Sequence, residues 1–383
     1  MTDPLYDTMT TDTNVGATER SIEERLESIE DPHLGEDVVS LGLVNHVRVA
    51  DGTAEVSLAF NAPYAPVEMD LGDRIREAIL EMGLEPDLTA RVGAEQGFDE
   101  EVLPNVRNVI AVSSGKGGVG KTTVAGNLAA GLHDRGARVG ILDADVHGPN
   151  VPRVLPVEGD PGVTPNGELV PPRSEGVMVM SMRFLTERPD DPAILRGPMV
   201  NNVMMKFLEG VEWGRLDYLI VDLPPGTGDA SLDLLQTMPV TGALILSTPQ
   251  RMSLDDARKG IRMFEGHHVP ILGVVENMAT FRCPGCDDDH EVFGGEGTKT
   301  LREDHDVPLV SRLPLHPDFG ADGTERPVVR EPESPVHDVT DELVGTVADR
   351  ISEVNRKTVA ANRGSSDSNG ENAGETAKAA GTR

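Results

Sequence analysis

The stretch from Val109 to Thr123 reads VIAVSSGKGGVGKTT and decides the fold of the larger part of the chain. An apolar run leads into a glycine-rich loop and then into a helical pattern, the context that a phosphate-binding loop requires. Glycines let backbone N–H groups turn toward a phosphate, and the start of the next helix adds a favourable dipole. Lys121 would reach the β and γ phosphates, and the Thr122 hydroxyl would bind Mg²⁺. The predicted nucleotide-binding residues are Gly115, Lys116, Gly117, Gly118, Val119, Gly120, Lys121, Thr122 and Thr123.

Outward from this loop, short apolar runs recur along the chain, with helical segments between most of them. Runs without polar alternation are typical of strands buried on both faces of a parallel sheet. We predict an α/β fold: a doubly wound, mostly parallel sheet in a P-loop domain of residues 108–356, preceded by a small α+β domain. Its expected elements are a helix over Thr122–Arg135 and strands over Val139–Leu142, Tyr218–Val221, Ala243–Leu246 and Ile271–Val275.

The small α+β domain is predicted over residues 18–97, and the acidic residues 98–107 are predicted to link it to the P-loop domain. Residues 1–17 and 357–383 are polar and show no periodicity, so we expect both ends to be disordered. The elements expected in the small domain are a helix over Ser21–Ile29, strands over Leu43–Val49 and Ala54–Phe60 joined by a turn at Asp51-Gly52, a helix over Val67–Met82 and a strand over Leu88–Val92.

The composition limits the classes of function. The formal net charge is −31, and only seven residues are Lys. A surface this acidic repels nucleic-acid phosphates and anionic lipids, so we expect neither nucleic acid nor a membrane as partner. Carboxylate-rich surfaces suit proteins that stay hydrated in concentrated salt, where charge repulsion is screened. No apolar run approaches the roughly 18 residues of a membrane helix. The acidic N-terminus has no signal-peptide core, so a cytoplasmic protein is expected.

Acidic residues follow two of the predicted strands. Asp143 and Asp145 come directly after Val139–Leu142, and Asp222 ends another apolar run. Asp222 is therefore the predicted Walker-B carboxylate, which holds Mg²⁺ through water. The loop Pro224–Asp229 that follows is rich in proline and glycine. Such a loop can approach the γ phosphate by its backbone and reset on hydrolysis, so we interpret it as a switch loop.

The two cysteines of the chain, Cys283 and Cys286, form a Cys-x-x-Cys pair beyond the last predicted strand. Two thiolates do not complete a metal site, because a cubane cluster or a structural zinc normally takes four ligands. A two-fold dimer supplies one pair from each subunit, so we favour a cluster that bridges two chains. Three alternatives stay open: structural zinc across the dimer, a redox dithiol, and a mononuclear zinc site completed by His290 and the acidic run Asp287–Asp289.

The Lys-Gly-Gly-x-Gly-Lys-Thr form of the loop, with Lys116 beside the first glycine, resembles the deviant Walker-A ATPases. That group includes the iron protein of nitrogenase and the Min and Par positioning ATPases. The Cys pair after Val275–Met278 narrows the resemblance to the Mrp/ApbC family of iron–sulfur cluster carriers, from residue 108 to about residue 355. The other matching segments, in the order of the family, are Ser114–Thr123, Leu142–Asn150, Arg196–Met199, Asp217–Asp229, Thr248–Pro249 and Asp256–Gly260.

This resemblance implies roles for four more residues. Lys116 would reach across a homodimer to the nucleotide of the partner, which makes hydrolysis depend on dimerisation. Asp145 would orient the attacking water, and Asp143 would lie beside it near the Mg²⁺ ion. Asn277 would bind adenine, since one amide can donate and accept hydrogen bonds at once. The residues expected to be catalytic are thus Lys116, Lys121 and Asp145.

The N-terminal module resembles the small domain of iron–sulfur and phenylacetate-degradation proteins, at Asp31-Pro32 and Leu41–Val44. Many relatives have a Cys shortly after the second strand, where Ala65 lies here. Any thiol chemistry of that module is therefore absent, and we expect it to dock a partner or to stabilise the protein.

The function implied by the resemblance is an ATP-hydrolysing carrier that binds a 4Fe–4S cluster across a homodimer and delivers it to apo iron–sulfur proteins. The alternative is a Min/Par-like positioning or regulatory ATPase with a structural zinc at the Cys pair. Positioning on a membrane requires a basic amphipathic helix, which the polar tail lacks. Positioning on DNA requires a basic face, which the sequence does not show. A reductase like the nitrogenase iron protein is disfavoured, because the two Cys of that protein lie far apart in sequence.

Overall fold

The computed structural model describes residues 12–90, 102–145, 148–185, 197–283, 285–286, 288–294, 297–320 and 326–379. The chain divides into two compact units. The first unit contains Met1–Asn61, Ala65–Gly93 and Ser352–Arg383, and the second contains Ala62–Tyr64 and Ala94–Ile351. The acidic stretch Phe98–Glu101 of the predicted linker lies outside the described residues.

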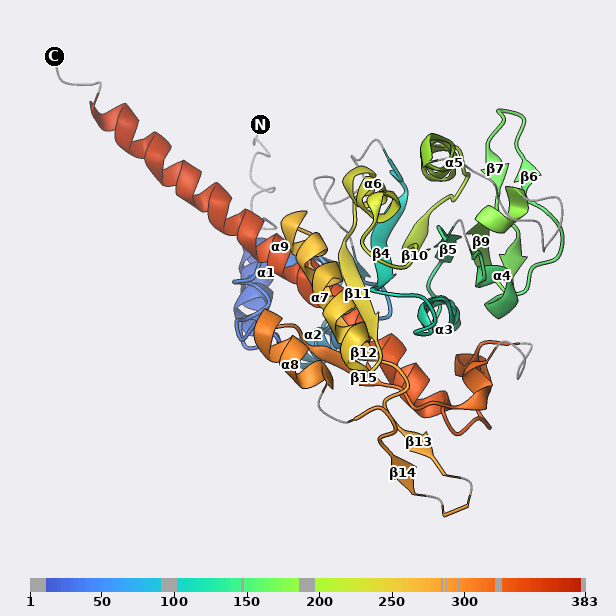
Figure 1. Cartoon of the computed structure of the whole chain (residues 1–383). Helices are drawn as coiled ribbons and strands as arrows, with labels where there is room; N and C mark the ends of the chain where they lie inside the picture. Colours follow the sequence, from blue (N-terminus) through green and yellow to red (C-terminus); the bar gives the residue numbers. More distant parts are fainter. Residues whose placement is uncertain are drawn as a thin grey trace, which may run out of the picture. The chain divides into compact units, whose positions relative to one another are not determined.

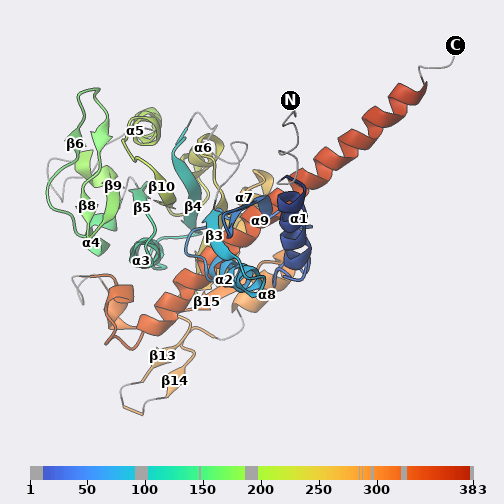
Figure 2. The same cartoon turned by 180° about the vertical axis from the view of Figure 1, so that it is seen from behind.

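The first unit has the small α+β fold that the sequence predicts (Figure 2). Strand β1 (Val44–Ala50) pairs antiparallel with β2 (Thr53–Leu58), which pairs parallel with β3 (Glu85–Ala90). Asp51 and Gly52 form the two-residue turn between β1 and β2, both at positive φ, as this tight hairpin requires. Helices α1 (Asp12–Leu26) and α2 (Pro66–Glu81) pack on the sheet. The most buried apolar side chains of this unit include Ile22, Leu26, Val56, Leu71, Ile75 and Ile79.

The second unit is built on an eight-stranded sheet in the order β15-β12-β11-β4-β10-β5-β9-β8. All neighbouring strands are parallel except β8 and β9. Every residue of β5, β10 and β11 is buried, which explains why these strands are mostly apolar and lack polar alternation. The strands are β4 (Val106–Ser114), β5 (Val139–Asp143), β8 (Arg173–Ser174), β9 (Val177–Ser181), β10 (Leu216–Asp222), β11 (Gly242–Ser247), β12 (Ile271–Glu276) and β15 (Leu309–Arg312).

Helices cover both faces of this sheet (Figure 1). Side chains of α5, α6, α7 and α8 share one core cluster with Val109 and Ala111 of β4. Because strand side chains alternate, Ile110 and Val112 face the other side, where α3 packs on β4, β5 and β10. The helices are α3 (Lys121–Asp134), α4 (Val151–Val154), α5 (Gly197–Glu209), α6 (Asp229–Thr237), α7 (Arg251–Gly266), α8 (Gly297–His305) and the 3₁₀ turns Met182–Leu185, Pro317–Phe319 and Val328–Arg330.

Two small hairpins stand outside the main sheet. One pairs β6 (Gly162–Val163) with β7 (Leu169–Val170). The other pairs β13 (Phe281–Arg282) with β14 (Asp289–His290) and contains the Cys pair. The doubly wound sheet places the loops after β4, β5, β10 and β12 at the carboxyl ends of parallel strands, where ligands bind in open α/β folds.

The predicted chain ends need correction. Helix α9 (His337–Ala379) runs through most of residues 357–383, for which the sequence predicted disorder, and α1 begins at Asp12, inside the predicted disordered residues 1–17. The P-loop domain was predicted to end at residue 356, whereas the compact units of the structure place Ser352–Arg383 in the first unit.

A buried polar network of the first unit explains this boundary. Arg356 is fully buried, and its Nε donates to Asp31 Oδ2 at 2.6 Å. One turn earlier, the Ser352 hydroxyl donates to Glu68 Oε1 at 2.5 Å. A buried ion pair with one partner removed leaves an uncompensated charge, so these contacts fix this turn of α9 to the first unit.

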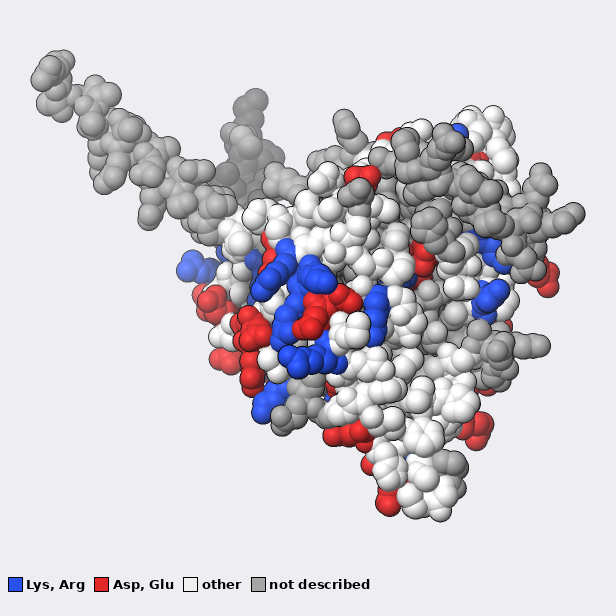
Figure 3. All heavy atoms as spheres, in the orientation of Figure 1, with Lys and Arg blue, Asp and Glu red and all other residues white. Residues whose placement is uncertain are grey.

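The surface charge of the second unit is not uniformly acidic (Figure 3). In the region where Figure 1 draws α7 and α8, basic side chains gather around acidic ones. Arg258 pairs with Asp255 and Asp304, and Lys259 pairs with Asp256. Exposed pairs of this kind contribute little to stability, so we assign them no structural role. Within the described parts of the chain, no helix is long and apolar enough to cross a bilayer.

Candidate functional site

The glycine-rich loop connects the end of β4 to the start of α3, as predicted. Gly118 and Gly120 have φ values of 78° and 88°, a backbone conformation that residues with a Cβ rarely adopt. Gly115 is required for a different reason: a Cβ there would lie 2.4 Å from the backbone of Asp256 in α7. The loop therefore requires glycines at these positions.

A cavity of about 280 Å³ lies at this loop. The start of α3 opens into it, so a helix dipole and backbone N–H groups favour an anion there. The residues that line it include most of the predicted loop residues, Asp145, and Pro225 of the predicted switch loop. Arg153 and Val154 also line it, and neither was predicted from the sequence. The complete lining is Ser114, Lys116, Gly117, Gly118, Gly120, Lys121, Thr122, Thr123, Asp145, Asn150, Arg153, Val154 and Pro225.

Asp222 accepts hydrogen bonds from the two loop side chains that are predicted to bind phosphate and Mg²⁺, Lys121 and Thr122. Lys121 Nζ donates to Asp222 Oδ1 at 2.5 Å, and Thr122 Oγ1 donates to Asp222 Oδ2 at 2.7 Å. The Lys121 and Asp222 side chains are 7% and 0% exposed. Buried charges need a partner, and here each supplies it for the other. The predicted loop lysine, hydroxyl and Walker-B carboxylate are therefore brought together by the fold.

Asp143 supports the site from beneath the cavity. Its Oδ2 accepts from the Val151 N–H at 3.0 Å and from the Ser181 hydroxyl at 2.9 Å, and its Oδ1 accepts from the Asp145 N–H at 3.3 Å. Burial raises the pKa of the Asp143 carboxyl to about 7, and the negative charge of Asp222 adds to this rise. Asp143 thus orders the loop after β5; its contact with Mg²⁺ stays a prediction.

Asp145 and Lys116 both line the cavity, and each has a contact within the chain. Asp145 Oδ1 accepts from the Gly148 N–H at 3.2 Å. Lys116 Nζ donates to Gln250 Oε1 at 3.1 Å, at the residue that precedes α7. Gln250 was not predicted from the sequence, although the matching segment Thr248–Pro249 lies directly before it. A role of Lys116 at the nucleotide of a second protomer requires that this contact be released.

Asn277 braces the phosphate loop. Its Nδ2 donates to the Val119 carbonyl at 2.9 Å, and its Oδ1 accepts from the Met278 N–H at 3.0 Å. A Cβ on Gly120 would lie 2.2 Å from that Nδ2, so the contact also explains the glycine. The amide donates and accepts at once, as the sequence suggested, but to its own chain. The predicted adenine contact of Asn277 stays a prediction.

The switch loop touches the phosphate loop through its backbone. The Gly226 N–H donates to the Ser114 carbonyl at 2.8 Å, and the Leu223 N–H donates to the Val112 carbonyl at 3.1 Å. Gly226 has a φ of 92°, which glycine adopts without strain. A small change at the phosphates can therefore alter the hydrogen bonds of this loop.

The Cys pair lies at the tip of the β13–β14 hairpin. Phe281 pairs with His290 and Arg282 with Asp289, while the Cys283 N–H donates to the Asp288 carbonyl at 2.9 Å. The N–H groups of Gly285 and Cys286 hydrogen-bond the Cys283 sulfur and lower the pKa of that thiol. Such N–H donors stabilise a thiolate, the form that binds metals.

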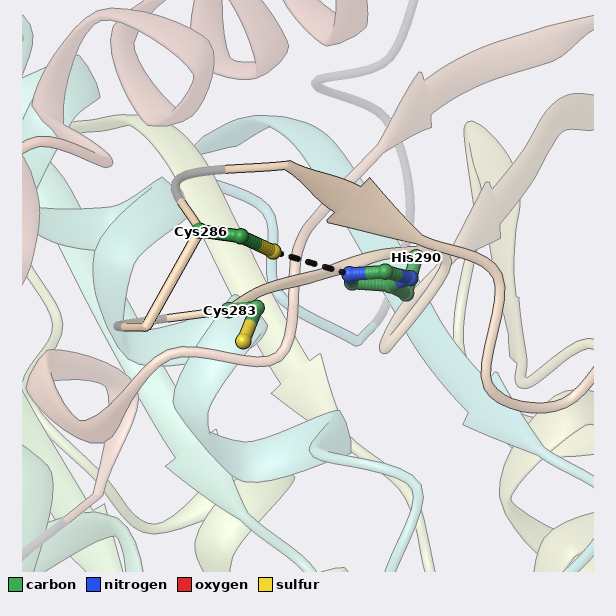
Figure 4. A group of neighbouring side chains, drawn as sticks. All are labelled: Cys283, Cys286 and His290. Atoms are coloured by element: carbon green, nitrogen blue, oxygen red, sulfur yellow. Dashed lines mark hydrogen bonds between the residues drawn. The ribbon is translucent and has the colours of Figure 1, made fainter.

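His290 joins the two thiols (Figure 4). The Sγ of Cys286 lies 3.6 Å from His290 Nε2, and the ligand atoms of Cys283, Cys286 and His290 all lie within 4.8 Å of one another. Of the predicted acidic run, Asp289 pairs with Arg282, and Asp287 lies outside the described residues. All three grouped residues were visible in the sequence, but their approach depends on the hairpin.

A glycine-rich loop between a buried strand and a helix, with a paired lysine, hydroxyl and Walker-B carboxylate at one cavity, defines a P-loop nucleotide-binding protein. Residues 105–348 match the model of the NUBPL iron-transfer P-loop NTPases within the ParA group. The chain belongs to this family.

Relatives and a solved structure agree with this assignment. The chain is 39% identical over 339 residues to the iron–sulfur cluster carrier protein of Synechocystis, covering 85% of this chain and 96% of the relative. It is 40% identical over 333 residues to the protein of the same name from Deinococcus radiodurans, covering 85% and 94%. A nucleotide-binding protein from Archaeoglobus fulgidus, solved with ADP, has 36% identity and a TM-score of 0.53 over 64% of this chain and 96% of that chain.

The first unit has a match of its own. Residues 19–90 match the model of iron–sulfur cluster assembly proteins, which confirms the resemblance noted at Asp31-Pro32. Asp31 is the residue that pairs with the buried Arg356, and Ala65 is fully buried before α2. No thiol is present in this unit, since both cysteines of the chain lie in the hairpin.

Proposed function

We propose that the protein is an ATP-hydrolysing iron–sulfur cluster carrier, which holds a 4Fe–4S cluster between the Cys pairs of two protomers and passes it to apo iron–sulfur proteins. The observation that supports this most is the position of Cys283 and Cys286. They lie on a short exposed hairpin of a P-loop NTPase, and backbone N–H groups stabilise one thiolate. A thiolate pair on a short, exposed hairpin suits a metal centre that must be transferred to another protein.

The count of ligands supports a dimer. A cubane cluster takes four thiolates, and one chain has two cysteines. Two protomers related by a two-fold axis supply the four thiolates. The same dimer would bring Lys116 to the nucleotide of the partner, once its contact with Gln250 is released.

The nucleotide site fits Mg²⁺ and ATP. The oxygen donors of Thr122 and Asp222 lie 2.7 Å apart at the cavity, and oxygen ligands are those that Mg²⁺ prefers. Mg²⁺ neutralises charge on the β and γ phosphates when bound. Lys121 would leave Asp222 for the phosphates, Asp145 would orient the attacking water, and Asp143 would hold the loop that positions Asp145.

A short connection joins the two sites. Asn277 holds the Val119 carbonyl of the phosphate loop, and six residues later the chain reaches Cys283. Between them, the Ala279 N–H donates to the Leu313 carbonyl of the segment after β15. We infer that a change in the loop on nucleotide binding reaches the hairpin through Asn277 and alters the geometry of the Cys pair.

Anaerobic reconstitution with iron and sulfide tests the proposal. We expect a coloured dimer with one cluster from the wild type, and no cluster from Cys283→Ala/Cys286→Ala with unchanged folding. ATPase activity measured without a cluster should be the same in both proteins. Bound metal is first removed from both proteins with a chelator, so that a zinc ion on the thiolates does not block loading. A metal-free wild type that stays colourless, or a double variant with full cluster content, would overturn the proposal. A metal-free wild type that takes up zinc but never a cluster would favour the alternative, a regulatory ATPase with structural zinc.

A further inference from the structure

The β13–β14 hairpin brings a third ligand to the Cys pair within a single chain. From the geometry of Cys283, Cys286 and His290 we propose that each protomer alone holds one divalent ion of the zinc class on these three residues, and that this ion excludes a cluster from the same thiolates. The inference uses the thiolates of the proposed function but does not depend on cluster transfer.

The distances fit a tetrahedral ion. With Zn–S of about 2.3 Å and Zn–N of about 2.0–2.1 Å, tetrahedral geometry places a sulfur and a nitrogen about 3.6 Å apart. Cys286 Sγ and His290 Nε2 lie 3.6 Å apart. All three ligand atoms lie within 4.8 Å of one another, and tetrahedral sulfurs lie about 3.8 Å apart. Figure 4 shows the Cys283 thiol turned away from the other two ligand atoms, so its side chain would rotate to complete the set.

The hairpin register sets this geometry. Pairing of Phe281 with His290 fixes the imidazole opposite the limb that leads to Cys283. The guanidinium of Arg282 spans the hairpin to both carboxylate oxygens of Asp289, at 3.1 and 3.2 Å. Figure 4 shows the Cys286 thiol pointing toward His290 across the tip. The paired backbone of β13 and β14 therefore places His290 opposite the cysteines, and the exposed Arg282–Asp289 pair follows the same register.

Three protein ligands leave one position of a tetrahedral ion open, which suits an exchangeable ion better than a permanent structural one. Two thiolates with an imidazole favour borderline ions such as Zn²⁺ and Co²⁺. The bridging cluster, in contrast, needs four thiolates and no imidazole. His290 therefore distinguishes the two states: it is a ligand of the ion and not of the cluster.

A Co²⁺ titration of the reduced full-length chain under anaerobic conditions tests the ion site. We expect one Co²⁺ per monomer, with thiolate charge-transfer bands and the intense visible bands of a tetrahedral ion. His290→Ala should weaken binding by at least about 10- to 100-fold, the loss that even a supporting residue of a metal site causes. His46→Ala, which removes an exposed imidazole of strand β1, should change nothing. His290→Cys should restore tight binding with a thiolate-rich spectrum.

Cluster reconstitution of the same variants separates this inference from the proposed function. His290→Ala should load one cluster per dimer as the wild type does, and prior Zn²⁺ should suppress loading of the wild type more than of His290→Ala. Unchanged Co²⁺ affinity in His290→Ala would overturn the ion site and leave the carrier function intact. Loss of both Co²⁺ and cluster in His290→Ala would overturn the division into two states. Failure of the wild type to load a cluster while Co²⁺ binds normally would count against the carrier function alone.

Discussion

The nucleotide cavity and the cysteine hairpin are built in opposite ways, although six residues of chain separate Asn277 from Cys283. Around the cavity, Lys121, Asp222 and Asn277 are buried and bonded to one another or to the loop. At the hairpin, Cys286 is exposed in the turn, and His290 is exposed on β14, a strand of two residues. Rigid preorganisation suits phosphoryl transfer, which depends on positioned charges. A pliable exposed tip suits a metal centre that has to change its ligands.

The largest effect should come from removing the buried lysine of the cavity. Lys121→Met takes away the cation that meets the β and γ phosphates, so ATPase activity should fall by at least about 10²–10³-fold, as when one preorganised donor is lost. Steady-state phosphate release and nucleotide binding by calorimetry check this. Lys299→Met, on the exposed surface of α8, is the matched control and should retain full activity.

The same variant sharpens the contrast between the two regions. Cluster reconstitution of Lys121→Met without nucleotide should match that of the wild type, because the hairpin takes no support from Lys121. If cluster content fell together with ATPase activity, the two regions would form one cooperative structure, and the comparison would be wrong.

Asp143 should make the stability of the second unit depend on pH. The pKa of Asp143 is raised to about 7 in the folded protein, from an ordinary value of about 4, so the folded state binds more protons between these limits. Stability from this group is present below about pH 4 and is lost as pH rises through 7, by up to about 1.4 kcal/mol per pH unit. Urea unfolding followed by fluorescence of Trp213, the single and buried tryptophan, measures it.

Asp143→Asn tests the cause of that dependence. An amide keeps an oxygen for the Val151 N–H and the Ser181 hydroxyl but does not titrate. The difference in unfolding free energy between wild type and variant should therefore shrink or change sign as the pH is raised from 4 to 8. Asp338→Asn, an exposed change, should run parallel to the wild type. A constant difference across this pH range would show that Asp143 does not titrate there.

Two glycines offer a smaller, matched test. A Cβ on Gly115 would lie 2.4 Å from Asp256, whereas the nearest contact of a Cβ on Gly285 is the Cys283 sulfur at 3.7 Å. Gly115→Ala should cost about 1–3 kcal/mol of unfolding free energy, as overpacking does, and weaken nucleotide binding. Gly285→Ala should stay within about 0.5 kcal/mol of the wild type. Equal costs in urea unfolding would mean that the hairpin tip is as tightly packed as the loop.

Whether a feature could be predicted from the sequence depends on how far apart in the sequence its interacting residues lie. Buried strands and the phosphate loop were predictable, because each is written in one contiguous segment with its own periodicity or motif. Strand β15 was missed, since it pairs only with β12 and is partly exposed. The contact of Gln250 with Lys116 and the contact of Asn277 with Val119 were not predicted. The partners are separated by 134 and 158 positions in the sequence, respectively. No local pattern encodes such contacts.

The chain ends show the same limit. Composition predicted disorder after residue 356, but composition does not report that Arg356 meets Asp31 from a distance of 325 residues. That buried pair places Ser352–Arg383 in the first unit, and the helix then continues to Ala379. The residues predicted as a boundary are thus buried and hydrogen-bonded within the first unit.

The smallest effect should distinguish the two cysteines from each other. N–H groups of Gly285 and Cys286 lower the pKa of Cys283, so near neutral pH more of it is thiolate. A thiolate of lower pKa is also a weaker nucleophile, so each Cys283 thiolate reacts more slowly. The larger thiolate fraction and the lower nucleophilicity partly cancel. We expect Cys283 to react with iodoacetamide a few-fold faster than Cys286, with the advantage disappearing above pH 9 and in urea, where the N–H bonds are lost. Fragment-ion mass spectrometry of the peptide after Arg282 assigns the two sites. Equal rates in the folded protein would mean that the tip does not organise its thiols before metal arrives, and that the ion itself shapes the site.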